Sequence, residues 1–293
     1  MKNIFIFLLF CCLICSFVFG ELEADDNNKK PTPKYYFLKS TGIVCVKAPC
    51  PSWEVTPTEG GASITVHELK FAKNINESVV FEGKFAVDVI HRGILVNGIV
   101  DKEKSVRFEV DNSYRVLPLN PQDQSTRSGR YYHVDRIMAK CKKEPCPNFS
   151  ATELNTGKQQ LANKLMEPYS NYLGVDQAWL NSKILTQEPV KAIVQANIFE
   201  GTIIGKAIYV NIVDPSISCP PLPIVDCIQN YVPVFKRDSD RCLHTDGCVK
   251  PGFCTLSIPV CQDGYRLTQF RSKPNACPSY HCDAWFLSTP KQF

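Results

Sequence analysis

Histidine, methionine and tryptophan are scarce in this chain of 293 residues, which has five, three and three of them. No histidine lies in a G-x-S-x-G or H-E-x-x-H context, and His67-Glu68 lacks the second histidine of a zinc motif. Paired carboxylates occur only near the N-terminus and on polar faces of strand-like segments. The sequence therefore indicates no class of enzyme. An enzyme stays the third hypothesis, because residues far apart in the sequence can meet in space.

Dense basic segments and long internal apolar runs are also lacking. The formal net charge of +4 is small and spread along the chain, so we expect no nucleic-acid partner. After the N-terminal segment, no apolar run is long enough to span a bilayer. The sequence predicts no cofactor.

The N-terminus has the pattern of a secretory signal peptide, residues 1–20. Lys2 provides the positive charge, residues 4–19 are apolar, and Gly20 suits a small-residue cleavage position. The acidic residues that follow favour a cleaved signal over an uncleaved membrane anchor, which is the alternative. We therefore expect a secreted protein without a membrane span after cleavage.

Cysteine usage agrees with an oxidising compartment. Of fifteen cysteines, three lie in the signal peptide. The even number that remains predicts six disulfides, among Cys45, Cys50, Cys141, Cys146, Cys219, Cys227, Cys242, Cys248, Cys254, Cys261, Cys277 and Cys282. None of the last eight has the Cys-x2-Cys spacing of a zinc site, so no metal site is expected. The spacing does not determine how these eight pair.

The chain contains one motif twice. Residues 35–51 (YYFLKSTGIVCVKAPCP) align without a gap with residues 131–147 (YYHVDRIMAKCKKEPCP), at an offset of 96 residues. This fixed spacing indicates duplication of a supersecondary unit. Each Cys-x4-Cys pair can close locally, as Cys45–Cys50 and Cys141–Cys146, and this is our prediction. The alternative is that the cysteines of one repeat pair with those of the other.

The repeat suggests a division of the chain into segments. These are a disordered lead-in (21–34), a first repeat domain (35–117), a linker (118–130), a second repeat domain (131–213) and a Cys-rich C-terminal module (214–293). We expect each repeat to fold by itself.

Apolar periodicity favours a mainly β fold, β-rich α+β, with a small disulfide-rich module at its end. Alternation predicts strands within 63–71, 79–89 and 106–110, and a strand from Ile204 to Ile212. Apolar residues four apart predict helices over 158–166 and 176–185 in the second repeat.

Two kinds of surface site are candidates. Asn76 and Asn148 begin N-x-S triplets and are possible glycosylation sites in a secreted protein. Lys47, Lys142 and Lys143 lie between the paired cysteines of the two repeats, on loops that a disulfide would brace. Such a loop suits a protease inhibitor, and it equally suits any hairpin that needs a soluble turn.

The pattern Tyr-Tyr-(x)8-Cys-x3-Pro-Cys-Pro, followed by Gly60-Gly61 and the segment 93–99 (GILVNGI), resembles an uncharacterised Cys-containing domain of secreted bacterial proteins. That domain opens with an aromatic strand and a short Cys loop and often occurs in tandem. The resemblance covers residues 35–213, implies two copies, and carries no known activity.

The sequence as a whole favours a secreted glycoprotein that acts without catalysis, as an extracellular binding or structural protein with a protein or glycan partner. The alternative function is a protease inhibitor that uses the Lys47 or Lys143 loop.

Overall fold

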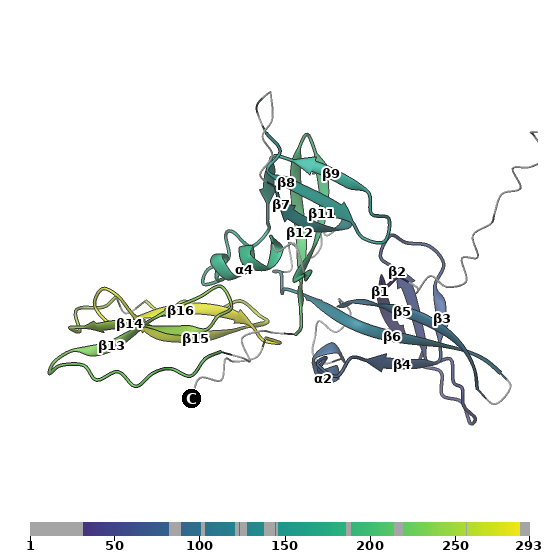
Figure 1. Ribbon diagram of the computed structural model, residues 1–293, viewed down its shortest axis with the longest axis horizontal. Coiled ribbons are helices and arrows are strands. Elements are labelled where there is room, and N and C mark those ends of the chain that lie inside the picture. The colour runs from purple at the N-terminus through teal and green to yellow at the C-terminus, as the bar shows by residue number, and fades with distance from the viewer. Residues whose placement is uncertain are drawn as a thin grey trace, which may run out of the picture. The chain divides into compact units, whose positions relative to one another are not determined.

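The computed structural model describes residues 32–81, 89–100, 103–120, 123, 128–137, 144, 146–185, 189–213, 219–255 and 257–287. They form a strand-rich protein with short helices, so the predicted mainly β, α+β fold class is confirmed (Figure 1). The predicted signal peptide and nearly all of the lead-in lie outside these ranges. Within the described ranges, no helix is long and apolar enough to cross a membrane.

The first half folds as a closed sheet. Its elements are β1 (Lys34–Ser40), β2 (Trp53–Pro57), β3 (Ile64–Val66), β4 (Glu68–Phe71), α2 (Glu77–Phe81), β5 (Val89–Val100) and β6 (Glu103–Val116). β1 pairs antiparallel with β2 and β5, and β3 pairs with β2. After the single residue His67 the same strand continues as β4, which pairs parallel with β6. Because β6 also pairs with β5, the sheet closes in the order β1-β2-β3/β4-β6-β5, a five-stranded Greek-key barrel of the OB type.

The second half has the same order. Its elements are β7 (Arg130–Arg136), β8 (Phe149–Glu153), β9 (Gln159–Ala162), β10 (Lys164–Met166), α4 (Gln177–Ile184), β11 (Ala192–Phe199) and β12 (Thr202–Asn211). β7 pairs with β8 and β11, β8 pairs with β9, and β10 pairs parallel with β12. The irregularities in strand pairing also correspond. The pairing register of β5 changes between Arg92 and Gly93, and that of β11 changes between Gln195 and Ala196. Tyr36 pairs with His91, and the shift in β5 comes one residue later; Tyr132 pairs with Val194, and the shift in β11 also comes one residue later.

The repeated Tyr-Tyr pair has an architectural role. The second tyrosine of each pair is buried in its barrel. The first contacts a tyrosine of the last strand of its own barrel: the ring centroids of Tyr35 and Tyr114 are 6.1 Å apart, and those of Tyr131 and Tyr209 are 5.8 Å apart. The aromatic start of the motif therefore joins the first strand of each barrel to its last.

The two barrels share a strand pairing. β6 and β12 pair antiparallel, with Tyr114 opposite Asn211, Arg115 opposite Val210 and Val116 opposite Tyr209. Since Tyr114 and Tyr209 occupy equivalent places, this junction has an approximate twofold symmetry. One buried apolar cluster extends across both halves. Neither half therefore has a complete set of packing partners by itself.

The start of the expected linker is part of this structure. Pro118 and Leu119 are buried, and the carbonyl of Leu117 accepts a hydrogen bond from the hydroxyl of Tyr169 at 2.8 Å. The carbonyl of Pro118 accepts another from Tyr265 at 2.9 Å. These residues connect the first barrel to the second half and to the tail. Residues 121–122 and 124–127 of the predicted linker lie outside the described residues.

Local periodicity was right for one helix and wrong for two segments. The helix predicted over 176–185 is confirmed as α4, but residues 159–162 and 164–166 are strands. The spacing of Leu161 and Leu165 indicated the buried face of a helix, but Leu161 is 57% exposed and its neighbour Ala162 is buried. In the first half, α2 (Glu77–Phe81) occupies the start of the segment 79–89 in which alternation predicted a strand, and residues 82–88 of that segment lie outside the described residues. The strands predicted within 63–71 and 106–110 and around Ile208 are confirmed.

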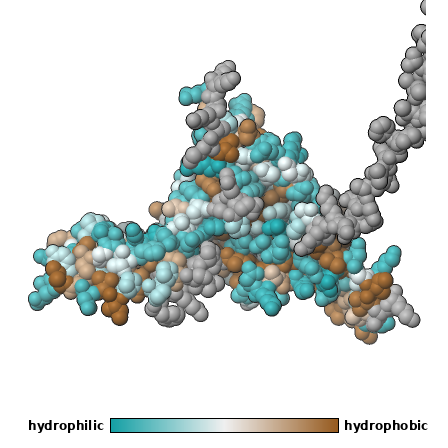
Figure 2. Space-filling model, viewed as in Figure 1, coloured by the Kyte–Doolittle hydropathy of each residue, from teal (hydrophilic) through white to brown (hydrophobic). Residues whose placement is uncertain are grey.

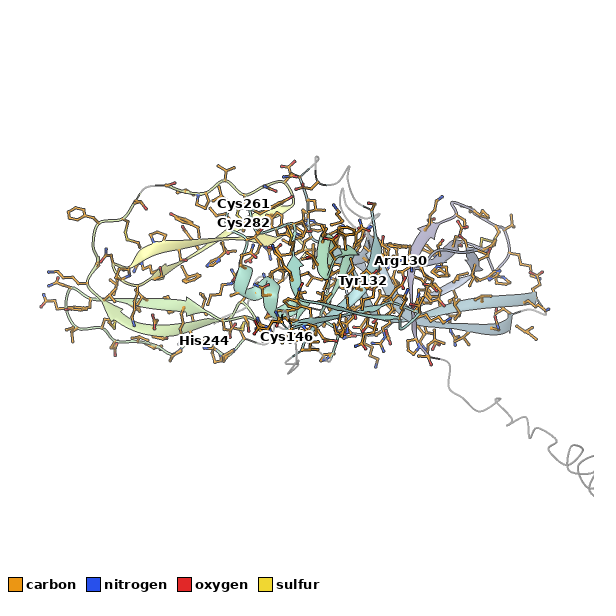
Figure 3. All side chains as sticks on the ribbon, turned by 90° about the horizontal axis from the view of Figure 1, so that it is seen from above. Arg130, Tyr132, Cys146, His244, Cys261 and Cys282 are labelled. Carbon is orange, nitrogen blue, oxygen red and sulfur yellow. A yellow bond between two sulfur atoms is a disulfide. The ribbon has the colours of Figure 1, made fainter. Side chains whose placement is uncertain are left out.

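The tail contains two hairpins that are built alike. β13 (Val232–Arg237) pairs with β14 (Leu243–Val249), and β15 (Tyr265–Ser272) pairs with β16 (Cys277–Ala284). The first hairpin carries the disulfides Cys219–Cys242 and Cys227–Cys248; the second carries Cys254–Cys277 and Cys261–Cys282, the last labelled in Figure 3. In both hairpins the paired cysteines are 23 and 21 residues apart. The tail is thus a second repeat within the chain.

Buried charges attach the tail to the second barrel. Asp176 caps the N-terminus of α4 and lies 3.1 Å from Nε of Arg237 in β13. The same guanidinium donates through Nη2 to Asp283 at 2.6 Å, and Arg241 lies 3.5 Å from that carboxylate. The side chains of Arg237, Arg241 and Asp283 are at most 6% exposed. Such a cluster is costly to desolvate and is severely destabilised when one charge is removed.

Candidate binding surface

The β1–β2 loop is held at two levels. At its base, the backbone N–H of Thr41 donates to the carbonyl of Ser52 at 3.0 Å, and its hydroxyl donates to the carbonyl of Pro51 at 2.7 Å. Further out, Cys45 and Cys50 form a disulfide. The loop between them is short, so its tip is restrained before any partner binds.

The tip of this loop is apolar and exposed. Val44 is 95% exposed, Val46 is fully exposed, and Ile43 is half exposed. Lys47 follows and is exposed as well. Single exposed apolar residues are ordinary on a protein surface, but here three of the four residues 43–46 are exposed apolar residues on one braced loop, which makes the loop a candidate interaction site.

The equivalent loop of the second half is mostly outside the described residues. Cys141, Lys142 and Lys143 fall there, so the predicted pairing of Cys141 and the two lysines stay predictions. Cys146 is disulfide-bonded.

The two N-x-S triplets differ in their surroundings. Asn76 is exposed just before α2, and its Oδ1 accepts hydrogen bonds from the backbone N–H of Ser78 at 3.1 Å and from the Ser78 hydroxyl at 2.8 Å. Asn148 is also exposed, but its Nδ2 donates to the carbonyl of Asn163 at 3.1 Å, and Ser150 is buried. The hydrogen bonds of the Asn76 side chain thus go to Oδ1, whereas at Asn148 it is Nδ2, the atom to which a glycan is attached, that is hydrogen-bonded.

The histidines are dispersed over the fold. His91 is buried in the first barrel, where its Nδ1 lies 2.9 Å from the hydroxyl of Ser113, and burial lowers its pKa to about 3. His244 in the tail, labelled in Figure 3, lies 2.7 Å from Asp238. His133 lies 3.6 Å from Asp135. Across the described ranges, no three His, Cys, Asp or Glu side chains are close enough to hold a metal ion.

The tail exposes further apolar residues that the sequence analysis did not single out. Phe253 is fully exposed, and large aliphatic residues on the segments that precede the hairpins are exposed too: Ile224, Ile228, Ile258 and Val260. Figure 2 shows brown, apolar surface on the tail, which is the part at the left of the view. The repeated spacing of the tail cysteines is the sequence signal for these segments, because it marks two similar hairpins, each preceded by such a segment.

Comparison with known proteins gives one informative match. The chain is 30% identical over 289 residues to an uncharacterized protein of Dictyostelium discoideum, an alignment that covers 98% of this chain and 97% of that protein. No family model matches the chain. No solved structure matches it either. The match extends over both barrels and the tail together.

Proposed function

We propose that this chain, which belongs to the same family as the uncharacterized Dictyostelium discoideum protein, acts outside the cell as a binding protein. It is a secreted, disulfide-bonded glycoprotein that binds another protein outside the cell, without catalysis. The contact surface is the braced β1–β2 loop, with Ile43, Val44 and Val46 as its apolar centre.

The observation that carries this proposal is the exposure of Val46, inside the segment that the Cys45–Cys50 disulfide closes, and of Val44, which directly precedes Cys45. Burying one such side chain against a partner contributes roughly 1.5–3 kcal/mol. The disulfide and the hydrogen bonds of Thr41 limit the entropy that the loop loses on binding. Since the tip is aliphatic, an apolar pocket of a protein suits it better than the polar surface of a glycan.

The position of the loop in the fold also supports the proposal. In barrels of the OB type, the loop between the first two strands is one of the segments that contact ligands. This is an analogy between folds, and it applies to the place of the loop and not to the kind of ligand.

The same proposal includes a domain history. We infer two duplicated barrel domains, residues 35–117 and 131–213, followed by a Cys-rich module at 214–293. The equal strand orders, the offset of 96 residues between β1 and β7, and the matching bulges support the duplication. The five described disulfides are typical of a protein that folds in an oxidising compartment, in keeping with secretion after cleavage at Gly20.

A capture experiment tests the proposal. The protein is immobilised and incubated with medium conditioned by the cells that secrete it. We expect the wild type to retain a protein partner. The double variant Val44→Ser/Val46→Ser should retain at least about tenfold less of this partner, because the variant removes the apolar contact. Lys47→Ala is the matched control, since it changes the same loop without changing its apolar centre. Equal retention by wild type and the double variant would contradict the proposal.

The exposed Lys47 favours a second function, inhibition of a trypsin-like protease. In that case wild type inhibits trypsin stoichiometrically and Lys47→Ala abolishes the inhibition, whereas Val44→Ser/Val46→Ser retains much of it. A titration of trypsin activity with the three proteins therefore distinguishes the two functions.

A further inference from the structure

A cavity of about 280 Å³ lies where the two barrels, α4 and the end of the tail meet. Asn112 of β6 and Val210 of β12 line it from the barrel junction. Trp179 of α4 and Leu287, at the end of the described tail, close other sides. The cavity therefore requires all three parts of the chain, and no single part contains it.

The walls are mainly apolar, but polar groups are placed at defined points. At the junction, Nδ2 of Asn211 donates to Oδ1 of Asn112 at 3.1 Å, so this amide pair is fixed in orientation. Val190 and Val213 contribute further apolar surface. An apolar cavity with a few oriented polar groups is the usual form of a small-molecule site.

Two lysines line the cavity. Lys183 of α4 is 3% exposed and is paired with Asp240 of the tail, Nζ to Oδ1, at 2.6 Å. Burial lowers the pKa of Lys183 against the opposing effect of Asp240, and the charges of Lys191 and Arg241 lower it further. Lys191 is half buried, and in the described part of the chain no carboxylate lies within ion-pair distance of it. Among the described residues, Lys183 therefore has a carboxylate partner and Lys191 has none.

We propose that this cavity binds a small amphipathic anion, an aromatic carboxylate of about two fused rings, with its carboxylate at Lys191. The size follows from comparison with an engineered cavity of ~150 Å³ that accepts benzene, since the volume here is about twice as large. The ring system lies against Trp179 and the aliphatic walls, where aromatic surface packs well. The site is separate from the β1–β2 loop, so it adds a small-molecule ligand to a protein whose proposed partner binds elsewhere.

Titration calorimetry with 2-naphthoate and its neutral analogue 2-naphthamide tests the proposal. We expect wild type to bind naphthoate more tightly than naphthamide. Lys191→Met retains the apolar stem and removes the charge, so it weakens naphthoate about tenfold and leaves naphthamide unchanged. Lys164→Met, an exposed lysine of β10 away from the cavity, is the matched control and leaves both affinities unchanged.

Val213→Phe tests the place of binding by filling the cavity, and it abolishes binding of both compounds if the protein stays folded. If this variant does not fold, the comparison of Lys191→Met with Lys164→Met decides alone. Absence of naphthoate binding to wild type overturns the proposal. So does equal binding of naphthoate by wild type and Lys191→Met, or unchanged binding by a folded Val213→Phe variant.

Discussion

Removal of the Asp283 charge should destabilise the tail, because Asp283 of β16 pairs with Arg237 of β13 and with Arg241 inside it. In Asp283→Asn, the guanidinium groups of Arg237 and Arg241 stay buried but lose the carboxylate that lies 2.6 and 3.5 Å from them. Arg237 keeps Asp176 of the second barrel at 3.1 Å. Breaking a buried pair by removing one partner costs about 3–5 kcal/mol. For a chain of this size, that loss corresponds to a decrease of about 6–20 °C in Tm.

The matched control is Asp246→Asn, the same substitution in the same tail. Asp246 pairs with Lys273 at 3.3 Å, but these side chains are 30% and 53% exposed. Loss of an exposed pair changes stability by at most about 1 kcal/mol. Differential scanning calorimetry gives the Tm of both variants. The fluorescence of Trp285 reports on the contact between the tail and the first barrel, because this ring stacks on Arg115 at 4.6 Å. Equal Tm values for the two variants would refute the reasoning.

The same cluster predicts acid sensitivity. Burial alone raises the pKa of Asp283, but the hydrogen bond from Arg237 and the charges of Arg237 and Arg241 outweigh it and hold the pKa below its ordinary value. A carboxylate with a depressed pKa stabilises the folded state fully above its unfolded pKa, about 3.9, and loses this contribution as pH falls through the folded pKa. Tm measured from pH 6 to pH 2 should therefore decrease below about pH 4 more in wild type than in Asp283→Asn.

Two other predictions concern modification and folding. Glycosidase treatment of the secreted protein should lower its mass, and Asn76→Gln should remove more of that difference than Asn148→Gln, because the Asn148 amide is engaged with a backbone carbonyl; equal losses would contradict this ranking. Expression of the chain cut before Gly129 should give fragments that aggregate when produced separately, because the β6–β12 pairing and the shared core are divided; two soluble fragments with dispersed NMR spectra would show instead that each barrel folds alone.

The sequence predicted the parts of the fold that depend on local patterns. The offset of 96 residues between the Tyr-Tyr motifs is also the offset between β1 and β7, since both motifs begin the first strand of a barrel. Alternation located β6 because Phe108 and Val110 face the core and their neighbours do not. Asp176 is the N-cap of α4, and its side chain accepts a hydrogen bond from the backbone N–H of Trp179.

Features that depend on contacts between distant segments could not be predicted. The parallel pairing of β4 with β6 closes the first barrel, and it joins residues almost 40 positions apart that carry no mark of their partnership. In the second barrel, Ala151 and Ala162 fill the places of Val55 and Val66, so these core positions carry little apolar signal, whereas the exposed Leu161 beside Ala162 has the spacing of a helical face with Leu165. The buried cluster around Asp283 combines charges from β13, β16 and α4, which only the folded chain brings together.

The pairing of the tail cysteines is encoded in their spacing. Successive gaps of 7, 14 and 5 residues between its first four cysteines are nearly repeated as 6, 15 and 4 between its last four. A repeated spacing implies a repeated pairing, and the two hairpins have it: first cysteine with third, second with fourth. Without this repeat, eight cysteines allow 105 pairings.

A photo-crosslinking amino acid at position 46 tests the central claim most directly, because it reports what the loop touches while the secreted protein is in its own medium. We expect irradiation to link the loop to a single protein partner, and the same crosslinker at exposed Lys164 to give no such product. A crosslink at position 46 that Val44→Ser abolishes would establish the apolar tip as the contact. Failure of position 46 to crosslink any protein, or identical products from positions 46 and 164, would contradict the account.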